Sequence, residues 1–283
     1  WRMRQVINKL ISEEDLYAAV ESAYSQGWRR VKLYFLTGLP TETDEDTLGI
    51  LEMARRCVEV GRAHQHNPSV TVSVGGFVPK PFTPFQWFGQ NTERELRRKV
   101  GLLRDELKRR PKAYRGVQLK WHDARASVVE GLMSRGDRRL GAIIEDVWRA
   151  GGVFQEWSEH FDIGLWEDAL DRHGLSLEDF VYRHRTEDEV LPWDHLSAGL
   201  HKDFLWQDWR DALEAVGLED CRWTPCYDCG ACTGYGIEHV VASAVPPAGG
   251  SQGTGQDLST GGTVPVMLRT RPSADRSPEA VGV

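Results

Sequence analysis

Three segments of the chain combine a helix-start signal with apolar residues at helical spacing. The tetrapeptides SEED, TDED and TERE begin at Ser12, Thr43 and Thr92, and each places a hydroxyl at an N-cap and a carboxylate three residues later. Apolar residues then recur every three or four positions, as on one face of an amphipathic helix. These stripes are Leu16, Ala19, Val20 and Ala23; Leu48, Leu51, Ala54 and Val58; and Leu96, Val100, Leu103 and Leu107. The pattern predicts three helices that each bury one face.

Two short apolar runs between these segments predict strands. VKLYFL (31–36) and VTVSV (70–74) are rich in β-branched and aromatic residues, which favour extended structure. Strands that alternate with helices indicate parallel βαβ units, so residues up to about 110 predict part of an α/β barrel or sheet. Two strands are too few for a parallel sheet. We therefore expect further strands from a preceding segment of a longer chain or from a partner.

The pattern after Pro111 is mostly helical. Residues 116–121 are compatible with a further strand, and helices are predicted over 137–150 and 201–216. Six of the eleven tryptophans lie between Trp157 and Trp223, a density that favours core anchors over substrate stacking. Residues 243–283 are rich in Pro, Gly, Ser and Thr and predict a disordered tail. The predicted domains are therefore 1–110, 111–242 and 243–283.

Composition and charge narrow the function classes. The chain is 40% hydrophobic and 27% charged, as soluble globular proteins are, and it contains neither a long apolar run nor a secretory signal. We therefore expect a cytoplasmic protein that does not enter a membrane. The net charge of -7 argues against unspecific coating of nucleic acid. Residues 92–115 are nevertheless basic, which favours a solvated helix face over a contact with an RNA backbone.

Four of the five cysteines fall within twelve residues. Cys221, Cys226, Cys229 and Cys232 have the spacing Cys-x4-Cys-x2-Cys-x2-Cys, and thiols in a reducing compartment stay available as metal ligands. The close spacing favours an iron-sulfur cluster, with a structural zinc site as the nearest alternative and disulfides as the least favoured. Cys57, by contrast, lies among the apolar positions of a predicted helix and is expected to be a small buried hydrophobe.

Two loops follow the predicted strands and are candidates for ligand binding. In TGLPTET (37–43), Gly38 would let a backbone approach a ligand, and Glu42 could accept hydrogen bonds. Taken alone, this loop is better explained as a Gly-Pro turn with a helix-start carboxylate. In GGFVPKPFTPFQW (75–87), Phe77 and Val78 follow the carboxyl end of the predicted strand, where they could pack on a purine or on the loop itself.

These segments are more specific in combination. GWRRVKLYFLTGLPTETDED, VSVGGFVPKPFTPFQW, SRGDRR and TPCYDCGAC resemble the uncharacterised radical S-adenosylmethionine proteins that carry a cobalamin-binding-type domain upstream. The resemblance covers residues 2–242. It implies an α/β fold: the C-terminal part of a (βα)6 partial TIM-like barrel, with its fifth and sixth strands, followed by a mostly helical, Trp-rich segment with the Cys cluster. It also implies a 4Fe-4S cluster and S-adenosylmethionine as cofactors, and it leaves open whether cobalamin is used.

The resemblance further implies a chemistry and site residues. In this superfamily, a 4Fe-4S cluster reduces S-adenosylmethionine to methionine and a 5′-deoxyadenosyl radical. Gly38 and Glu42 would lie near the adenosyl or methionine portion, and Phe77, Val78 and Pro79 would border the adenine. Related families modify tRNA or ribosomal components, so RNA or a ribosomal component is an expected substrate class.

The chain departs from this family in one respect that affects its expected activity. The catalytic signature Cys-x3-Cys-x2-Cys is absent, and the cysteines at 221–232 come after the barrel strands. They therefore indicate an auxiliary iron-sulfur site, with Cys221 favoured over His239 as fourth ligand. We expect that the chain is a fragment, that it cannot cleave S-adenosylmethionine alone, and that its partner is the missing N-terminal portion of the same enzyme.

Two further interpretations stay open from the sequence. The chain could be a zinc-stabilised RNA-binding or protein-interaction module that uses the basic helix and the tryptophans, or a structural fragment of a split gene. His122, His195 and His201 are interpreted as surface or core histidines rather than as acid-base groups or cobalamin ligands.

Overall fold

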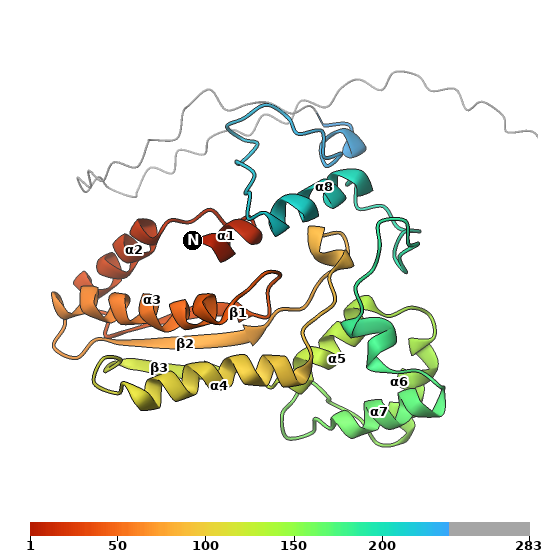
Figure 1. Ribbon diagram of the computed structural model, residues 1–283, viewed down its shortest axis with the longest axis horizontal. Helices are drawn as coiled ribbons and strands as arrows, with labels where there is room; N and C mark the ends of the chain where they lie inside the picture. Colours follow the sequence, from red (N-terminus) through yellow and green to blue (C-terminus); the bar gives the residue numbers. More distant parts are fainter. Residues whose placement is uncertain (238–283) are drawn as a thin grey trace, which may run out of the picture. The chain divides into compact units, whose positions relative to one another are not determined.

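The computed structural model describes residues 1–237 and divides the chain into two compact units (Figure 1). Among the described residues, the first unit comprises 1–196 and 206–217, and the second comprises 197–205 and 218–237. The predicted disordered tail, 243–283, lies outside the described residues. The predicted domain boundaries at residues 110 and 242 stay a prediction.

A small parallel sheet lies at the centre of the first unit. It consists of β1 (Arg30–Thr37), β2 (Ser69–Gly76) and β3 (Val117–Trp121) in the order β1-β2-β3, with all pairs parallel. The two strands predicted from their apolar runs are confirmed, as is the further strand at 116–121. The mixed α/β class is therefore established for the described residues. A partial TIM-like barrel, which needs more strands than these, stays a prediction.

The predicted helices around the sheet are also confirmed. They are α2 (Glu13–Ser25), α3 (Asp44–Arg62) and α4 (Glu93–Arg109), and a short helix α1 (Arg2–Val6) precedes them. Ser12 and Thr43 form reciprocal capping boxes, with Asp15 and Asp46 respectively as the returning carboxylates. The Thr92 hydroxyl accepts the Glu95 N–H at 3.3 Å. Local side-chain bonds therefore fix where each helix begins.

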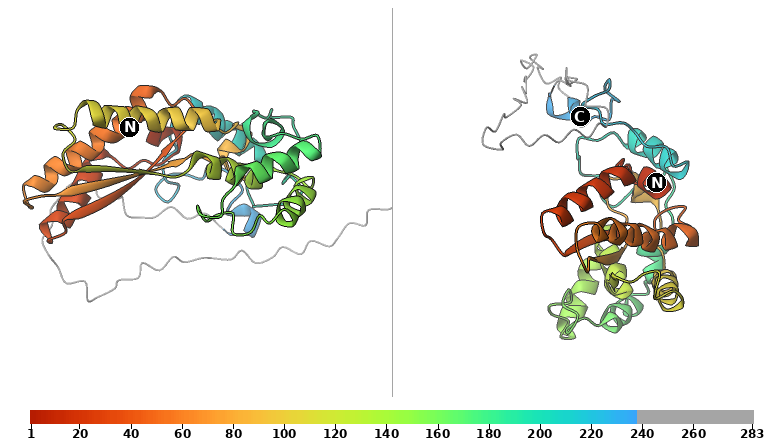
Figure 2. Two further views of the ribbon diagram at one scale, coloured as in Figure 1. Left: turned by 90° about the horizontal axis from the view of Figure 1, so that it is seen from below. Right: turned by 90° about the vertical axis from the view of Figure 1, so that its left-hand side faces the viewer.

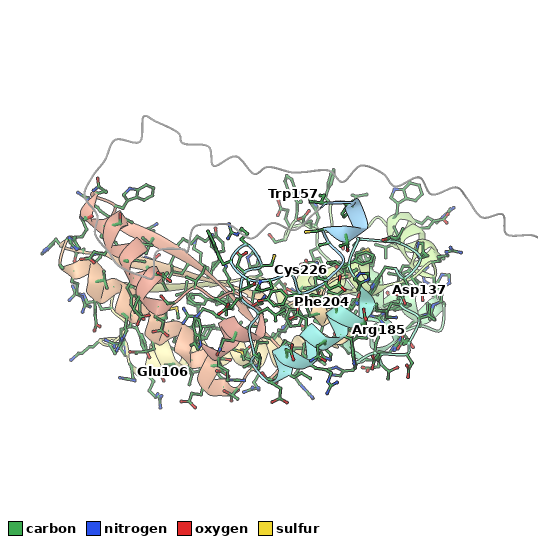
Figure 3. All side chains as sticks on the ribbon, turned by 90° about the horizontal axis from the view of Figure 1, so that it is seen from above. Glu106, Asp137, Trp157, Arg185, Phe204 and Cys226 are labelled. Carbon is green, nitrogen blue, oxygen red and sulfur yellow. The ribbon has the colours of Figure 1, made fainter. Side chains whose placement is uncertain are left out.

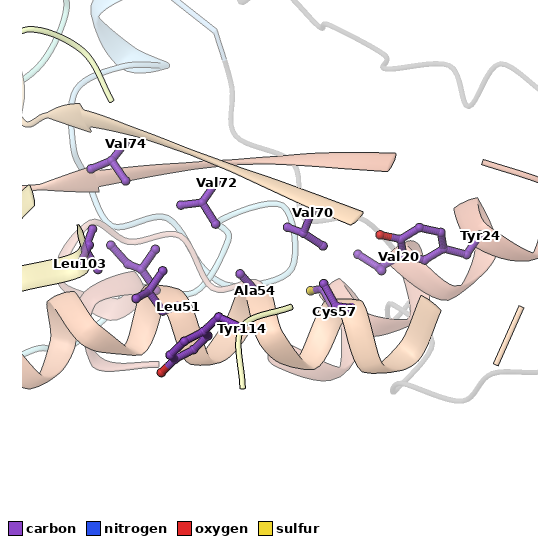
Figure 4. Close-up of a cluster of buried hydrophobic side chains, with 12 residues drawn as sticks. Val20, Tyr24, Leu51, Ala54, Cys57, Val70, Val72, Val74, Leu103 and Tyr114 are labelled. Atoms are coloured by element: carbon purple, nitrogen blue, oxygen red, sulfur yellow. The ribbon is translucent and has the colours of Figure 1, made fainter. Parts of the chain in front are cut away.

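These helices cover one face of the sheet, and the main core lies between them (Figure 2, Figure 4). Side chains alternate along a strand, so the valines at 70, 72 and 74 all point toward α3, where they meet Leu51, Ala54 and Cys57. Cys57 is fully buried, as predicted, and burial raises the pKa of its thiol to about 11. The apolar faces of the helices and of the strands therefore pack together in one apolar layer.

The opposite face of the sheet is more polar and more exposed. Lys32, Tyr34 and Leu36 of β1 point to this side, and Tyr34 is 73% exposed. Thr71 and Ser73 occupy the same face on the central strand, between the outer two strands. The sheet therefore differs from a fully covered parallel sheet, whose strands are apolar on both faces.

A second apolar cluster is built from helices after the sheet. These are α5 (Ala124–Arg135), α6 (Leu140–Arg149), α7 (Ile163–Arg172) and a π-helical turn, η2 (Glu178–Tyr182). The helix predicted over 137–150 corresponds to α6, whereas α5 and α7 had not been predicted. Arg135 of α5 is fully buried, and its guanidinium donates to the carbonyls of Phe180, Gln86 and Arg183 at 3.1–3.2 Å. The SRGDRR segment thus supplies a side chain that ties three segments together.

The predicted Trp-rich helix is α8 (Lys202–Leu213), which begins in the second unit and ends in the first. Three of the six tryptophans from Trp157 to Trp223 are buried, as predicted: Trp166, Trp193 and Trp209. Trp206 is partly buried, and Trp157 and Trp223 are exposed. Within residues 1–237, none of the helices is both long and apolar enough to cross a membrane.

Candidate functional site at the carboxyl ends of the strands

The loop after β1 is organised around the carboxylate of Glu42. This carboxylate accepts hydrogen bonds from Gly38 N at 2.6 Å and Leu39 N at 2.9 Å, and from the hydroxyls of Thr37 and Thr47 at 2.9 and 2.5 Å. The ammonium of Lys99 lies 3.3 Å away, and both side chains of this ion pair are nearly fully buried. Glu42 therefore holds the loop in shape. Its expected contact with a bound molecule stays a prediction.

Gly38 is required by this loop for two separate reasons. Its φ of +88° lies in the left-handed region, which side-chain-bearing residues adopt at a cost. A Cβ at this position would also lie 2.8 Å from Cδ2 of Leu96 on α4. The backbone of β1 and the helix after β2 thus approach closely where only a glycine fits, and the Asn91 amide donates to the Gly38 carbonyl at 3.2 Å.

The loop after β2 buries the residues that were expected to border an adenine. Phe77 N donates to Thr37 O at 2.8 Å, so the β1 and β2 loops are joined directly. Phe77, Val78 and Pro79 are all buried, and the ring of Phe77 meets that of Phe85 edge-on at 5.2 Å. This arrangement matches the loop-packing interpretation. Contact of these three residues with an adenine stays a prediction.

Tryptophans of α8 pack on the same loop. The Trp209 ring lies 6.1 Å from that of Phe85 and 5.8 Å from that of Phe88, and the Trp206 ring lies 4.9 Å from that of Trp87. Trp193 donates its indole N–H to the buried Gln86 side chain at 2.7 Å. The proline-rich loop is therefore fixed by aromatic residues from more than 100 positions later in the chain.

A cavity of about 580 Å³ opens at the carboxyl ends of the strands. Small-molecule sites occupy roughly 300–1,000 Å³, so the volume suits a ligand. The lining residues come from β1, β2, α4 and the end of β3: Thr37, Val74, Gly75, Gly76, Leu96, Arg97, Val100, Arg104, Trp121, His122, Asp123 and Ala124. Of the expected site residues, none is itself part of this lining, although Gly38 and Phe77 lie directly beside Thr37 and Gly76 in the chain.

The sequence indicated the basic helix and the tryptophans as an alternative RNA-binding surface, but it did not place Arg97, Arg104 and Trp121 together in one cavity. Arg97 and Arg104 are seven positions apart and so occupy one face of α4, and Trp121 ends the third strand. The guanidinium of Arg104 lies over the Trp121 ring at 5.2 Å from its centroid. A tryptophan at the carboxyl end of a strand, together with arginines on the helix before that strand, is the sequence pattern that indicates such a site.

The four clustered cysteines lie in the second unit. Cys226, labelled in Figure 3, is on an irregular segment, and its sulfur accepts the Asp228 N–H at 3.3 Å. Desolvation raises the pKa of the Cys221 thiol, and the charges of Asp220, Cys232 and Cys229 raise it further. Positive φ angles at Asp228 and Gly230 bend the backbone between them. His239 lies outside the described residues.

The donor set of this segment suits a thiophilic metal centre. Four thiols and an N–H directed at a sulfur are features that zinc and iron-sulfur sites share. Up to residue 237, however, the structure contains no group of three His, Cys, Asp or Glu side chains in a metal-binding arrangement. The four cysteines as ligands therefore stay a prediction.

Comparison with known proteins gives one similarity. The chain is 28% identical over 144 residues to an uncharacterised protein of Methanocaldococcus jannaschii, a match that covers 51% of this chain and 30% of that protein. The chain thus spans about a third of the length of the curated relative that it matches. No protein family model matches the chain, and no solved structure matches it.

Proposed function

We propose that the chain is the C-terminal part of a radical S-adenosylmethionine enzyme with an auxiliary iron-sulfur site. The main support for the proposal is that two glycine-containing loops meet at the carboxyl ends of the adjacent parallel strands β1 and β2. Phe77 N donates a hydrogen bond to Thr37 O, and a cavity lies beside this contact. Parallel α/β folds bind their ligands at this edge of the sheet. The sequence resemblance supplies the identity of the cofactor.

The polar face of the sheet supports the same proposal. Lys32, Tyr34, Thr71 and Ser73 would be unusual on a face that helices cover, but they suit the inside of a barrel that holds a polar cofactor. The strands that would close such a barrel belong, in this proposal, to the N-terminal portion of the enzyme. The far greater length of the archaeal relative is compatible with a longer parent protein.

The chain's own residues would act mainly by positioning. The buried pair Glu42 and Lys99 fixes the β1 loop, and Gly75, where a Cβ would meet no atom closer than 3.8 Å, leaves room for a ligand at the β2 backbone. At the second unit, thiolates from Cys221, Cys226, Cys229 and Cys232 would hold the auxiliary centre, and the Asp228 N–H would stabilise the charge on the Cys226 sulfur. A cluster bound there would supply electron transfer or structural stability. The substrate class that we propose is RNA or a ribosomal component.

Anaerobic reconstitution with iron and sulfide tests the cysteine site. We expect a broad absorption near about 400 nm and iron bound in proportion to protein, both lost in Cys229→Ala and Cys232→Ala. Cys57→Ala is the matched control, because this thiol is buried in α3 of the first unit, whereas the clustered cysteines belong to the second. A colourless protein that retains one zinc per chain would contradict the iron-sulfur assignment.

A zinc-stabilised module is the second candidate function. Cys226 and Cys229 have the Cys-x2-Cys spacing of the knuckles that hold structural zinc, and the Asp228 N–H is directed at the Cys226 sulfur. Elemental analysis of protein purified without added metal separates the two candidates: one zinc with no iron or sulfide favours the module, and iron with acid-labile sulfide favours the enzyme.

A further inference from the structure

We propose that the cavity between α4 and the end of β3 binds a nucleoside phosphate, with the base stacked on Trp121 and the phosphate held by Arg104 and Arg97. This proposal does not rest on the radical enzyme or on the cysteine site. It arises from the residues that line the cavity and from their charges.

Trp121 provides a stacking surface. Its indole is 47% exposed although it ends a strand of the sheet, and the Arg104 guanidinium covers it at 5.2 Å from the ring centroid. An exposed indole beside a planar cation is the combination on which unpaired bases stack, because every base has a π-face that both groups attract. An indole that served only the core would be buried like Trp87 or Trp209.

The cationic groups provide the phosphate contact. Within the part of the chain that the structure describes, Arg104 has no carboxylate partner among the ion pairs, whereas most other cations of α4 do. Arg97 pairs with Glu93 at 2.7 Å on the exposed surface, and such a pair exchanges readily for a phosphate. Asp123, the carboxylate in the lining, is neutralised by Arg125, whose Nη2 lies 2.6 Å from it.

Gly75 and His122 also line the cavity, one position beyond Val74 and Trp121. Their side-chain positions belong to the face of the sheet that carries Leu36, because a Cβ at Gly75 would lie 3.8 Å from both Leu36 and His122. The contacts that the cavity offers a ligand are therefore the Trp121 ring for the base and the arginines of α4 for the phosphate.

The nucleoside phosphate could be a free nucleotide or one unit of a single-stranded RNA. The test is fluorescence anisotropy of the full chain, without added metal, with a labelled single-stranded RNA oligonucleotide and with adenosine 5′-monophosphate, adenosine and inorganic phosphate as competitors. A free-nucleotide site predicts displacement by adenosine 5′-monophosphate at a concentration similar to its own Kd. An RNA site predicts tight RNA binding that the mononucleotide displaces only weakly. Either result supports the site if it depends on the residues named here.

Single substitutions test whether binding depends on these residues. Trp121→Ala should raise the Kd about tenfold, the usual loss for one stacked base, and Arg104→Ala should raise it by a similar factor and weaken its salt dependence. Trp148→Ala is the matched aromatic control on α6. Arg56→Ala is the control for Arg97→Ala, because both arginine side chains are 57% exposed and both pair with a glutamate four residues earlier. The proposal is overturned if no probe binds at low salt, or if the control variants weaken binding as much as the cavity variants.

Discussion

At the scale of single residues, the β1 loop depends on a glycine whose two roles can be separated experimentally. Gly27 and Gly38 both have positive φ, +94° and +88°, but a Cβ at Gly27 would meet no atom within 4 Å, whereas one at Gly38 would meet Leu96 at 2.8 Å. We expect Gly27→Ala to lower the free energy of unfolding by about 1 kcal/mol and Gly38→Ala by about 2–4 kcal/mol. Urea denaturation measures both. Equal losses would show that the close approach to α4 adds nothing.

The buried ion pair between Glu42 and Lys99 is a second feature at this scale that the sequence did not predict. Both side chains are nearly fully buried, so removing one charge leaves the other without compensation. We expect Glu42→Gln to lower the free energy of unfolding by about 2–4 kcal/mol. Glu52→Gln removes a carboxylate from the exposed pair with Arg55 and should cost less than about 1 kcal/mol.

The double variant Glu42→Gln with Lys99→Met tests the origin of this loss. If the cost comes from an unpaired buried ammonium, the double variant should recover part of the stability that Glu42→Gln loses. Losses that simply add would indicate that the hydrogen bonds to Gly38, Leu39, Thr37 and Thr47 carry the effect instead of the charge.

At the scale of elements, α8 and the proline-rich loop form one packed assembly. Trp209 is buried against Phe85 and Phe88, so Trp209→Ala should open a cavity and lower the free energy of unfolding by about 3–5 kcal/mol. It should also expose residues 77–88 to limited proteolysis. Trp148→Ala removes an exposed tryptophan and should change neither property. Unchanged cleavage of 77–88 in Trp209→Ala would mean that the prolines alone fix the loop.

The elements also show why some of the fold followed from the sequence and some did not. The helices beginning at Ser12, Thr43 and Thr92 combine a local cap with a clear stripe, and both signals act within a few residues of the chain. Helix α5 carries no such stripe, because Ser127, Gly131 and Arg135 are buried alongside its apolar residues. Tertiary partners decide its orientation. The burial of Glu42 and Phe77 could likewise not be predicted from local sequence patterns, since their partners Lys99 and Phe85 come from other elements.

At the scale of the whole molecule, buried acids predict how stability depends on pH. Burial raises the pKa of Cys57 from 9.0 to about 11 and that of Tyr24 from 10.0 to about 12. The unfolded chain therefore loses these protons at lower pH than the folded chain does. Their contribution to stability is complete below about pH 9 and is lost as pH rises through about 11 and 12.

Chemical denaturation between pH 8 and pH 10.5 measures this decline. Cys57→Ala should flatten the first part of this decline, because a thiol pKa raised from 9.0 to about 11 corresponds to at most about 3 kcal/mol of stability. Surface carboxylates such as Asp44, whose pKa Arg98 lowers, are ionised throughout this range and cannot cause the decline. A slope that is identical in Cys57→Ala and in the unmodified chain would contradict the assignment to this thiol.

The division of the chain into two units predicts that metal stabilises one of them selectively. The four cysteines belong to the second unit, while the sheet and both apolar clusters belong to the first. A metal that binds only the folded second unit should stabilise it by about 2.7 kcal/mol at a hundredfold excess over its Kd. Hydrogen exchange should slow in peptides from residues 218–237 and stay unchanged in α3. Cys229→Ala should abolish the effect, and a chelator should reverse it. Equal protection of α3 would instead indicate that metal stabilises the chain as one cooperative body.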